Sequence, residues 1–176
     1  PAQYFHLLHR QMHGGPDRRG VRKPLVIFTP KSLLRHPRCV SRVEELTDGA
    51  FHEVLADTGA AEPERVARIL LCSGKVYYDL AAERDQRQAG QVALVRVEQL
   101  YPLPDSQLQD ALLRYPPAAE VAWVQEEPRN MGAWRYIQEQ MQPLLAETRR
   151  TLQYVGRAES ASPATGSHKR HAKEQQ

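Results

Sequence analysis

The sequence is poor in cysteine and has no long apolar run. Of its 176 residues only two are cysteines, Cys39 and Cys72, and neither lies in a Cys-x-x-Cys motif. We therefore expect reduced thiols rather than a disulfide framework, which favours the cytosol or an organelle matrix. No stretch approaches the roughly 18 consecutive apolar residues that a membrane helix needs. The first residues also lack the charged start and apolar core of a signal peptide.

Sequence motifs for several common chemistries are missing too. There is no Gly-x-Ser-x-Gly, no His-Glu-x-x-His, no full Gly-x-Gly-x-x-Gly and no Walker-type loop. The net charge is +3, but the basic groups are not interleaved with aromatic residues, which argues against nucleic-acid binding. His6, His9 and His13 have helical spacing, yet no carboxylate or cysteine stands at a supporting distance in the sequence. We therefore expect no metal site.

The part of the chain from residue 66 onward alternates between apolar runs and amphipathic stretches. The expected strands are 66–72, 92–97, 121–125 and 152–155, and the expected helices are 75–87, 105–114 and 132–145. Alternation with short loops is typical of an α/β protein with a doubly wound, mostly parallel sheet.

The earlier part of the sequence has a different organisation. Residues 3–13 have the apolar spacing of a helix, and a basic loop is expected over 14–22. Residues 24–30 predict a short buried strand of a parallel sheet. Because one helix and one strand cannot form a core, we expect both to belong to a domain that begins upstream. Residues 38–66 are expected to be a linker with little regular structure.

An acidic pair is the most distinctive local feature. The apolar run 121–124 leads into Glu126 and Glu127 at the carboxyl end of a strand, where ligands and partner subunits meet open α/β sheets. Neighbouring strand residues point to opposite faces, so the two carboxylates are poorly placed to share a proton. We favour a structural or interface role over a general acid/base pair. Asn130 is expected to cap the next helix.

Two further segments could hold an anion. Ser73, Gly74 and Lys75 join a strand to a helix, where backbone N–H groups and a lysine can bind phosphate, although a tight turn with an exposed lysine is the favoured interpretation. Lys31 and Arg35 follow the predicted strand at 24–30, and the alternative to an anion site there is a salt bridge at a domain boundary.

Six segments stand out in order along the chain, and they span residues 1–8, 24–37, 71–80, 95–102, 125–134 and 154–166. The most distinctive stretches within them are Thr-Pro-Lys-Ser-Leu-Leu-Arg-His-Pro and Gln-Glu-Glu-Pro. Together the six segments resemble the C-terminal region of the 2-oxoglutarate dehydrogenase first component, the thiamine-diphosphate-dependent decarboxylating subunit.

The resemblance implies a division of the chain into four parts. Residues 1–40 would be the C-terminal end of a pyrimidine-binding domain, and 41–65 a linker. Residues 66–160 would form a transketolase C-terminal-like domain, and 161–176 a polar tail that is either flexible or docked on a neighbour.

The resemblance also implies an activity for the full subunit. Members oxidatively decarboxylate 2-oxoglutarate on thiamine diphosphate and Mg²⁺ and pass succinyl to lipoyl groups of the dihydrolipoyl succinyltransferase component. They act as homodimers in the bacterial cytoplasm or the mitochondrial matrix. The Gly-Asp-Gly…Asn motif and the active-site histidines of the family are absent from this sequence. No catalytic or cofactor-binding residue therefore carries over, and we expect the chain alone to be inactive.

Two alternatives to this function remain open. One is a 2-oxoadipate-specific relative, and the other is a stand-alone module that binds nucleotides or a partner. The family also has sites for acetyl-CoA or AMP, and the resemblance makes Lys31, Arg35 and Lys23 candidate contacts for such an effector. The residues expected to shape turns and subunit contacts are Ser73, Lys75, Glu126, Glu127 and Asn130.

Overall fold

A computed structural model describes residues 1–13, 23–59, 62–164, 166, 167, 169 and 173. The basic loop expected at 14–22, and much of the tail beyond residue 164, therefore lie outside the described residues. The chain divides into two units, an N-terminal unit of residues 1–52 and a C-terminal unit of residues 53–176. No described helix has the length and apolarity needed to cross a membrane.

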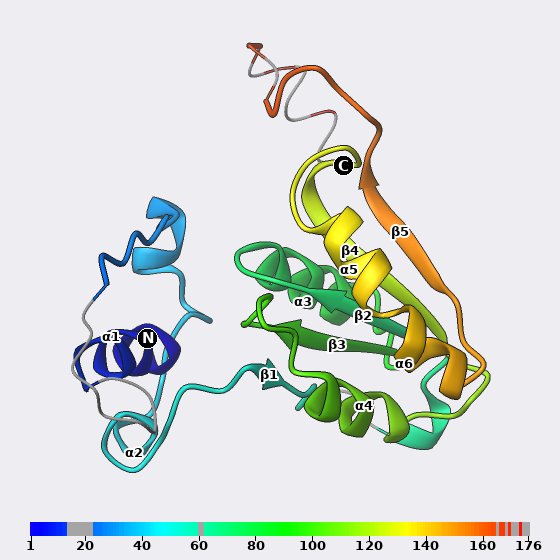
Figure 1. Cartoon of the computed structure of the whole chain (residues 1–176), viewed down its shortest axis with the longest axis horizontal. Coiled ribbons are helices and arrows are strands. Elements are labelled where there is room, and N and C mark those ends of the chain that lie inside the picture. Colours follow the sequence, from blue (N-terminus) through cyan, green and yellow to red (C-terminus); the bar gives the residue numbers. More distant parts are fainter. Residues whose placement is uncertain (14–22, 60–61, 165, 168, 170–172, 174–176) are drawn as a thin grey trace. The chain divides into compact units, whose positions relative to one another are not determined.

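The N-terminal unit consists of short helices joined by extended chain. Its elements are α1 (Ala2–His13), the 3₁₀ helix η1 (Lys31–Arg35) and α2 (Val43–Thr47), as Figure 1 shows. The helix expected at 3–13 is thus confirmed. The imidazole Nε2 of the buried His6 lies 2.8 Å from the carbonyl oxygen of Glu45, which ties α1 to α2.

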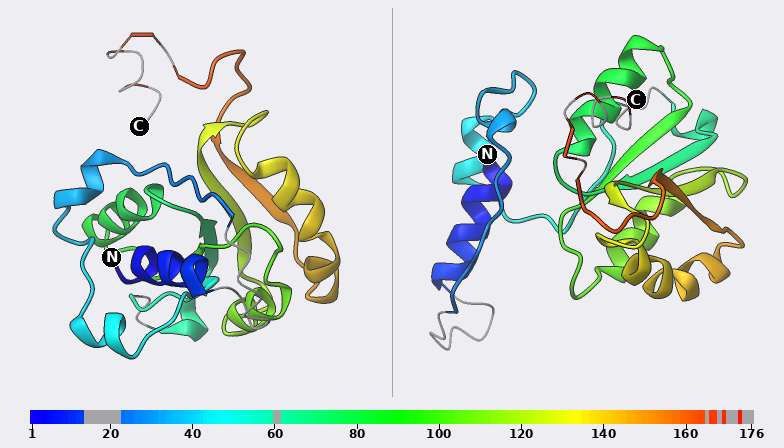
Figure 2. Two further views of the ribbon diagram at one scale, coloured as in Figure 1. Left: turned by 60° about the vertical axis from the view of Figure 1, so that its left-hand side comes forward. Right: turned by 90° about the horizontal axis from the view of Figure 1, so that it is seen from above.

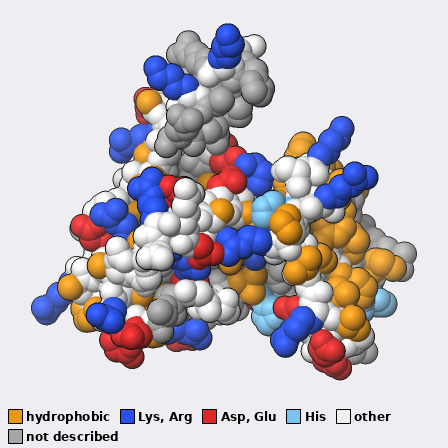
Figure 3. Space-filling view, turned by 180° about the vertical axis from the view of Figure 1, so that it is seen from behind, with side chains coloured by type: hydrophobic (Ala, Val, Ile, Leu, Met, Phe, Trp, Pro, Cys, Tyr) orange, Lys and Arg blue, Asp and Glu red, His pale blue; other side chains and the backbone are white. Residues whose placement is uncertain are grey.

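The strand predicted at 24–30 is wrong for the part of the chain that the structure describes. These residues are extended but belong to no sheet. Val26 is 74% exposed and Phe28 is 93% exposed. A strand forms only beside another strand that accepts and donates its backbone hydrogen bonds, and no described segment does so here. Figure 3 shows hydrophobic side chains gathered on one face of this unit.

The C-terminal unit is built on a five-stranded sheet of order β1-β3-β2-β4-β5. The two-residue β1 is antiparallel to β3, and the other neighbours are parallel. The fold class expected from the sequence is confirmed. The strands are β1 (Val54–Leu55), β2 (Arg68–Cys72), β3 (Val92–Val97), β4 (Glu120–Pro128) and β5 (Leu152–Arg157).

Helices cover both faces of this sheet. One face carries α3, and the opposite face carries α4, α5 and α6, as the two views in Figure 2 show. Their bounds are α3 (Val76–Gln86), α4 (Asp105–Leu113), α5 (Trp134–Gln140) and α6 (Gln142–Glu147). The single helix expected at 132–145 is divided into α5 and α6. Pro143 stands at the start of α6, where a proline is tolerated, and it cannot donate the backbone bond that a continuous helix would need.

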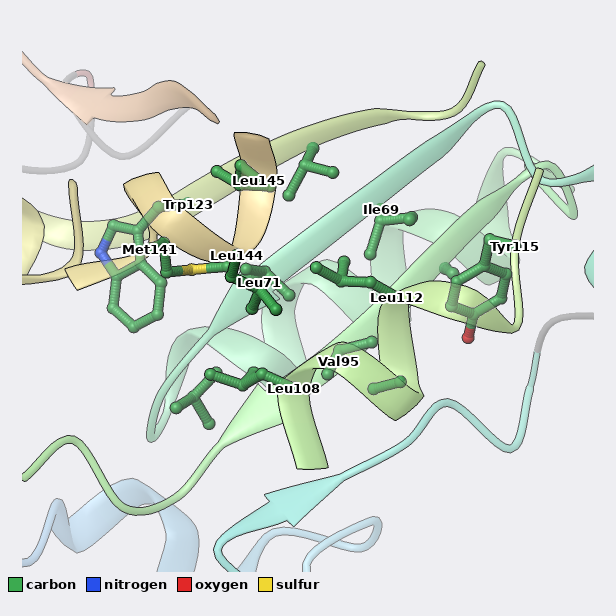
Figure 4. Packing of buried hydrophobic residues seen from close by; sticks show 14 of the residues in the cluster. Ile69, Leu71, Val95, Leu108, Leu112, Tyr115, Trp123, Met141, Leu144 and Leu145 are labelled. Atoms are coloured by element: carbon green, nitrogen blue, oxygen red, sulfur yellow. The ribbon is translucent and has the colours of Figure 1, made fainter. Parts of the chain in front are cut away.

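The core lies between the sheet and the α4–α6 layer. Strand residues Ile69, Leu71 and Trp123 alternate with residues of the opposite face, and they pack against Leu108 of α4 and Ile137 of α5. Each of these five is at most 1% exposed, and Figure 4 shows most of them among their neighbours. Their burial fixes the sheet against the α4–α6 layer.

The expected linker contains ordered structure that its sequence does not predict. β1 adds to the sheet edge at Val97, and Asp57 follows it into the interior. The Asp57 carboxylate lies 2.6 Å from Nη1 of Arg84, with side-chain exposures of only 1% and 8%. It also accepts a 3.0 Å hydrogen bond from the backbone N–H of Leu94. The expectation of irregular chain is therefore wrong for this stretch. Two strand residues and one aspartate form too short a pattern for sequence periodicity to detect.

A second buried charge stabilises the opposite end of the sheet. The guanidinium of Arg150 donates to the carbonyl oxygens of Leu112 (3.0 Å), Tyr115 (2.9 Å) and Pro116 (2.8 Å). These carbonyls lie at the end of α4, where a helix leaves acceptors without internal partners. Arg150 thereby joins the end of α4 to the segment that enters β5.

Candidate functional site at the carboxyl edge of the sheet

The carboxyl ends of β2 and β4 carry an ion pair. Lys75 follows the tight turn after β2, and Glu126 lies on β4. The Lys75 Nζ is 2.6 Å from Glu126 Oε1 and 3.2 Å from the Asp79 carboxylate, which lies one turn into α3. Burial alone lowers the pKa of Lys75, but hydrogen bonds to Glu126 and Asp79 and their charges outweigh it, so the pKa is raised. The lysine is held in its charged form.

The turn itself needs the glycine. Gly74 has a φ of +74°, a backbone conformation that residues with a side chain rarely adopt, and nothing lies within 4 Å of the position that a Cβ would take. The tight turn predicted at Ser73–Lys75 is therefore present, with open space beside it. Lys75 is only part-exposed, because it folds toward Glu126.

A second ion pair lies at the end of β3. Arg96 Nη2 is 2.8 Å from Glu98 Oε1, and both side chains are largely buried. The guanidinium also lies over the ring of Tyr77, 4.6 Å from its centroid. Cys72 is buried close by, and that burial raises the pKa of its thiol to about 12, against a smaller lowering by Arg96. Such a thiol is inert as a nucleophile or metal ligand.

Glu126 and Glu127 lie in the same strand, as expected, and do not act as a pair. Glu126 is bound to Lys75, whereas the Glu127 side chain is exposed. Because adjacent strand residues face opposite sides, the geometry offers no shared proton between them.

The residue just before them organises the loop that follows β4. The buried amide of Gln125 accepts hydrogen bonds from Nε1 of Trp123 and from the backbone N–H of Trp134, each at 3.0 Å. Its NH₂ group donates to the carbonyl oxygens of Glu127, Pro128 and Met131. This residue was not singled out in the sequence, since a glutamine at a strand end resembles an ordinary surface residue.

Asn130 does not cap a helix, so that prediction is wrong. α5 begins at Trp134, and its N-cap residue is Ala133, without a side-chain cap. Asn130 instead exchanges two hydrogen bonds with Ser160: its Nδ2 donates to the carbonyl oxygen at 2.9 Å, and its Oδ1 accepts from the backbone N–H at 3.1 Å. The intervening residues of the loop separate Asn130 from the helix start.

The candidate effector contacts lie in the N-terminal unit. Lys31 and Arg35 occupy the two ends of η1, and both are exposed, as is Lys23. Neither Lys31 nor Arg35 forms an ion pair with another described residue. The backbone carbonyl of Lys23 accepts a hydrogen bond from the side chain of Gln11. Both side chains are thus exposed on one short helix.

Ligands for a metal–diphosphate group are not assembled in the described residues. They contain no group of three or more His, Cys, Asp or Glu side chains placed to hold a metal ion. His6 is buried against α2, while the rings of His9 and His13 lie side by side with centroids 4.3 Å apart. The carboxylates at the sheet edge are already bound to Lys75 and Arg96. These residues do not fit Mg²⁺-bound thiamine diphosphate.

The fold and this edge define an α/β domain of the transketolase C-terminal type, in which internal ion pairs occupy the carboxyl ends of the strands. Residues 40–176 match the family described as 2-oxoglutarate dehydrogenase C-terminal. The chain belongs to this family.

Curated relatives extend the match to the whole chain. The 2-oxoglutarate dehydrogenase E1 component of Azotobacter vinelandii is 44% identical, with 100% of this chain and 18% of that protein covered. The proteins of the same description from Cupriavidus necator and Geobacillus sp. are 45% and 46% identical, each with 99% of this chain and 18% of the relative covered. The chain thus spans 18% of the length of these relatives.

Proposed function

We propose that this chain works as the C-terminal part of a 2-oxoglutarate dehydrogenase E1 component. The full subunit would oxidatively decarboxylate 2-oxoglutarate on thiamine diphosphate and Mg²⁺ and transfer succinyl to lipoyl groups of a dihydrolipoyl succinyltransferase, in the bacterial cytoplasm or a mitochondrial matrix. The observation that carries the proposal is the 44–46% identity to E1 components across nearly every residue of the chain. The cofactor would be held by other parts of the subunit, since the residues described here do not fit it.

A hybrid enzyme tests this proposal. The matching C-terminal region of the A. vinelandii relative would be replaced by this chain, and 2-oxoglutarate-dependent ferricyanide reduction would be measured with thiamine diphosphate and Mg²⁺. We expect a rate within about tenfold of the parent, which corresponds to about 1.4 kcal/mol in the barrier. The parent without the region, and the isolated chain, should show no turnover. A well-folded hybrid without activity, or decarboxylation by the isolated chain, would contradict the proposal.

We further propose the domain division 1–40, 41–65, 66–160 and 161–176 for the assembled subunit, with residues 1–40 completing a pyrimidine-binding domain. The exposed apolar side chains of the N-terminal unit support this, because uncovered residues such as Phe28 gain stability only against another surface. The turn and interface residues Ser73, Lys75, Glu126, Glu127 and Asn130 would shape the edge that lies near the homodimer contacts.

Lys31 and Arg35, with Lys23 nearby in sequence, are proposed to contact an anionic effector such as acetyl-CoA or AMP. Their exposure and shared charge support this role. In the hybrid enzyme, the double change Lys31→Gln and Arg35→Gln should weaken the response to acetyl-CoA at least tenfold without changing the basal rate. Arg65→Gln, an exposed change in the C-terminal unit, is the control. An unchanged acetyl-CoA response in the double variant would exclude these contacts.

A further inference from the structure

The strand order creates a switch point between β2 and β4. The chain leaves β2 toward β3 on one side, and β4 then returns to the other side of β2. In open α/β sheets, ligands bind in the crevice outside the carboxyl ends of two such strands, because the two connections depart in opposite directions. In this chain the crevice is bordered by the Ser73–Lys75 turn and by Glu126.

The crevice has the parts of an anion site. α3 is an 11-residue helix that begins at the turn, so its positive end faces the crevice. Lys75 adds a full positive charge there, and the position beside Gly74 is open. A phosphate group placed at this point would meet both favourable features.

Side chains of the protein already bind the lysine of this site. The Glu126 carboxylate reaches across from β4 to within 2.6 Å of the Lys75 ammonium, and Asp79 binds the same ammonium at 3.2 Å. One positive and two negative side chains leave a local charge of −1. At the next strand, Arg96 is likewise paired with Glu98. An incoming phosphate would therefore meet net repulsion rather than an available cation.

We propose that Glu126 is the built-in anion of the switch-point crevice and that its carboxylate excludes phosphate-bearing ligands from a site that the fold otherwise provides. The domain therefore uses the crevice to lock the β2–α3 turn onto β4, and it is not a nucleotide-binding module at this edge. Neutralising Glu126 alone uncovers the latent site, since Lys75 and the start of α3 remain in place.

Inorganic phosphate and pyrophosphate are the probes. Titration is followed by calorimetry and by the backbone amide resonances of residues 73–76, in the wild-type chain and in Glu126→Gln. Glu126→Gln should show saturable pyrophosphate binding. The wild type should not saturate over the same range, which corresponds to binding at least tenfold weaker than that of the variant. The matched control is Glu127→Gln, the same change at the exposed neighbour, which should behave as the wild type. The double variant Glu126→Gln with Lys75→Gln should lose the gained binding.

Two results overturn the proposal. One is a folded Glu126→Gln variant that gains no pyrophosphate binding. The other concerns the wild type alone: saturable pyrophosphate binding that shifts the 73–76 resonances of the wild-type chain would show that Glu126 does not exclude the ligand.

Discussion

At the residue scale, the strand end 125–127 shows how three chemically similar side chains acquire different roles. Gln125 is buried and faces three carbonyl oxygens through its NH₂ group, Glu126 is bound to Lys75, and Glu127 is exposed. The amide both donates to those carbonyls and accepts from Trp134, whereas an ionised carboxylate of the same size could only accept. The identity of this position is thus fixed by hydrogen-bond direction and not by size.

Gln125→Glu should therefore destabilise the protein. A carboxylate at this buried position would face carbonyl oxygens without a donor, which costs about 2–4 kcal/mol of unfolding free energy. Urea denaturation followed by tryptophan fluorescence measures the loss. Gln153→Glu, the same change at an exposed site on β5, is the control and should alter stability by less than about 0.5 kcal/mol. Equal losses of unfolding free energy in the two variants would show that the hydrogen bonds of the Gln125 amide do not stabilise the protein.

The two cysteines should differ in reactivity. Cys72 is buried and has a pKa of about 12, while Cys39 is part-exposed. A disulfide reagent at pH 8 should modify Cys39 and leave Cys72 unmodified until the chain unfolds. In Cys39→Ser, the folded protein should release no coloured thiolate. Rapid modification of that variant would contradict the burial of Cys72.

The same thiol gives stability a pH dependence. Between pH 9 and about 12 the folded state keeps the Cys72 proton that the unfolded state loses, so the unfolded state binds fewer protons and the unfolding free energy falls as pH rises. The Cys72→Ala variant should show a flatter stability profile over this window when urea midpoints are compared.

At the element scale, single buried charges anchor segments that have little core of their own. Asp57 holds the chain after β1 through Arg84 and the Leu94 N–H. Asp57→Ala should cost about 3–5 kcal/mol, because the buried Arg84 charge loses its 2.6 Å partner and keeps the more distant Asp85 carboxylate, 3.8 Å from its Nε. Adding Arg84→Met should recover part of this loss. If the double variant is no more stable than Asp57→Ala, the cost does not arise from the buried arginine charge.

Arg150 anchors the end of α4 in the same way. Arg150→Met should lower the unfolding free energy by about 2–4 kcal/mol, since four carbonyl oxygens lose a charged donor. Arg149→Met is the matched control, because the neighbouring side chain is exposed. Chemical denaturation of both variants tests the difference, and a loss of similar size in the control would point to a general charge effect.

Elements with many residues in one pattern were predictable from the sequence. β2 to β5 and α1, α3 and α4 were expected within a few residues of their observed bounds, because their apolar spacing is repeated over several positions. β1 was missed because two residues contain no period. The strand at 24–30 was wrongly expected, since apolar sequence predicts a strand's preference but does not supply its neighbour.

The candidate site was predictable only in outline. The turn at Ser73–Lys75 and the acidic strand end were identified from residue types, each at the carboxyl end of a predicted strand. The Lys75–Glu126 bond and the Gln125 network depend on which strands are adjacent. That adjacency is a long-range property, and local sequence does not encode it in a form that spacing rules can detect.

At the scale of the whole chain, the two units differ in how much hydrophobic core stabilises them. All buried hydrophobic residues in the described part of the chain belong to the C-terminal unit, between Val66 and Leu145. A chain of residues 53–176 should therefore unfold cooperatively with the urea midpoint of the full sequence. Residues 1–52 alone should show no cooperative transition. A midpoint that drops when 1–52 are removed would show that the N-terminal unit stabilises the sheet.

The hydrogen bonds between Asn130 and Ser160 link the chain beyond β5 to the loop after β4, so proteolysis of that chain can measure how often the loop opens. The two hydrogen bonds hold the Ser160 backbone as a neighbouring strand would, although no strand is present there. A protease needs several residues of unpaired backbone around the bond that it cuts. Cleavage by trypsin after Arg157 therefore requires the Asn130–Ser160 bonds to open together with the bonds that the Arg157 carbonyl accepts from the Arg129 N–H and the Tyr154 hydroxyl. The rate of that single cut, compared between the wild type and Asn130→Ala, would report how often the loop after β4 opens in the folded protein.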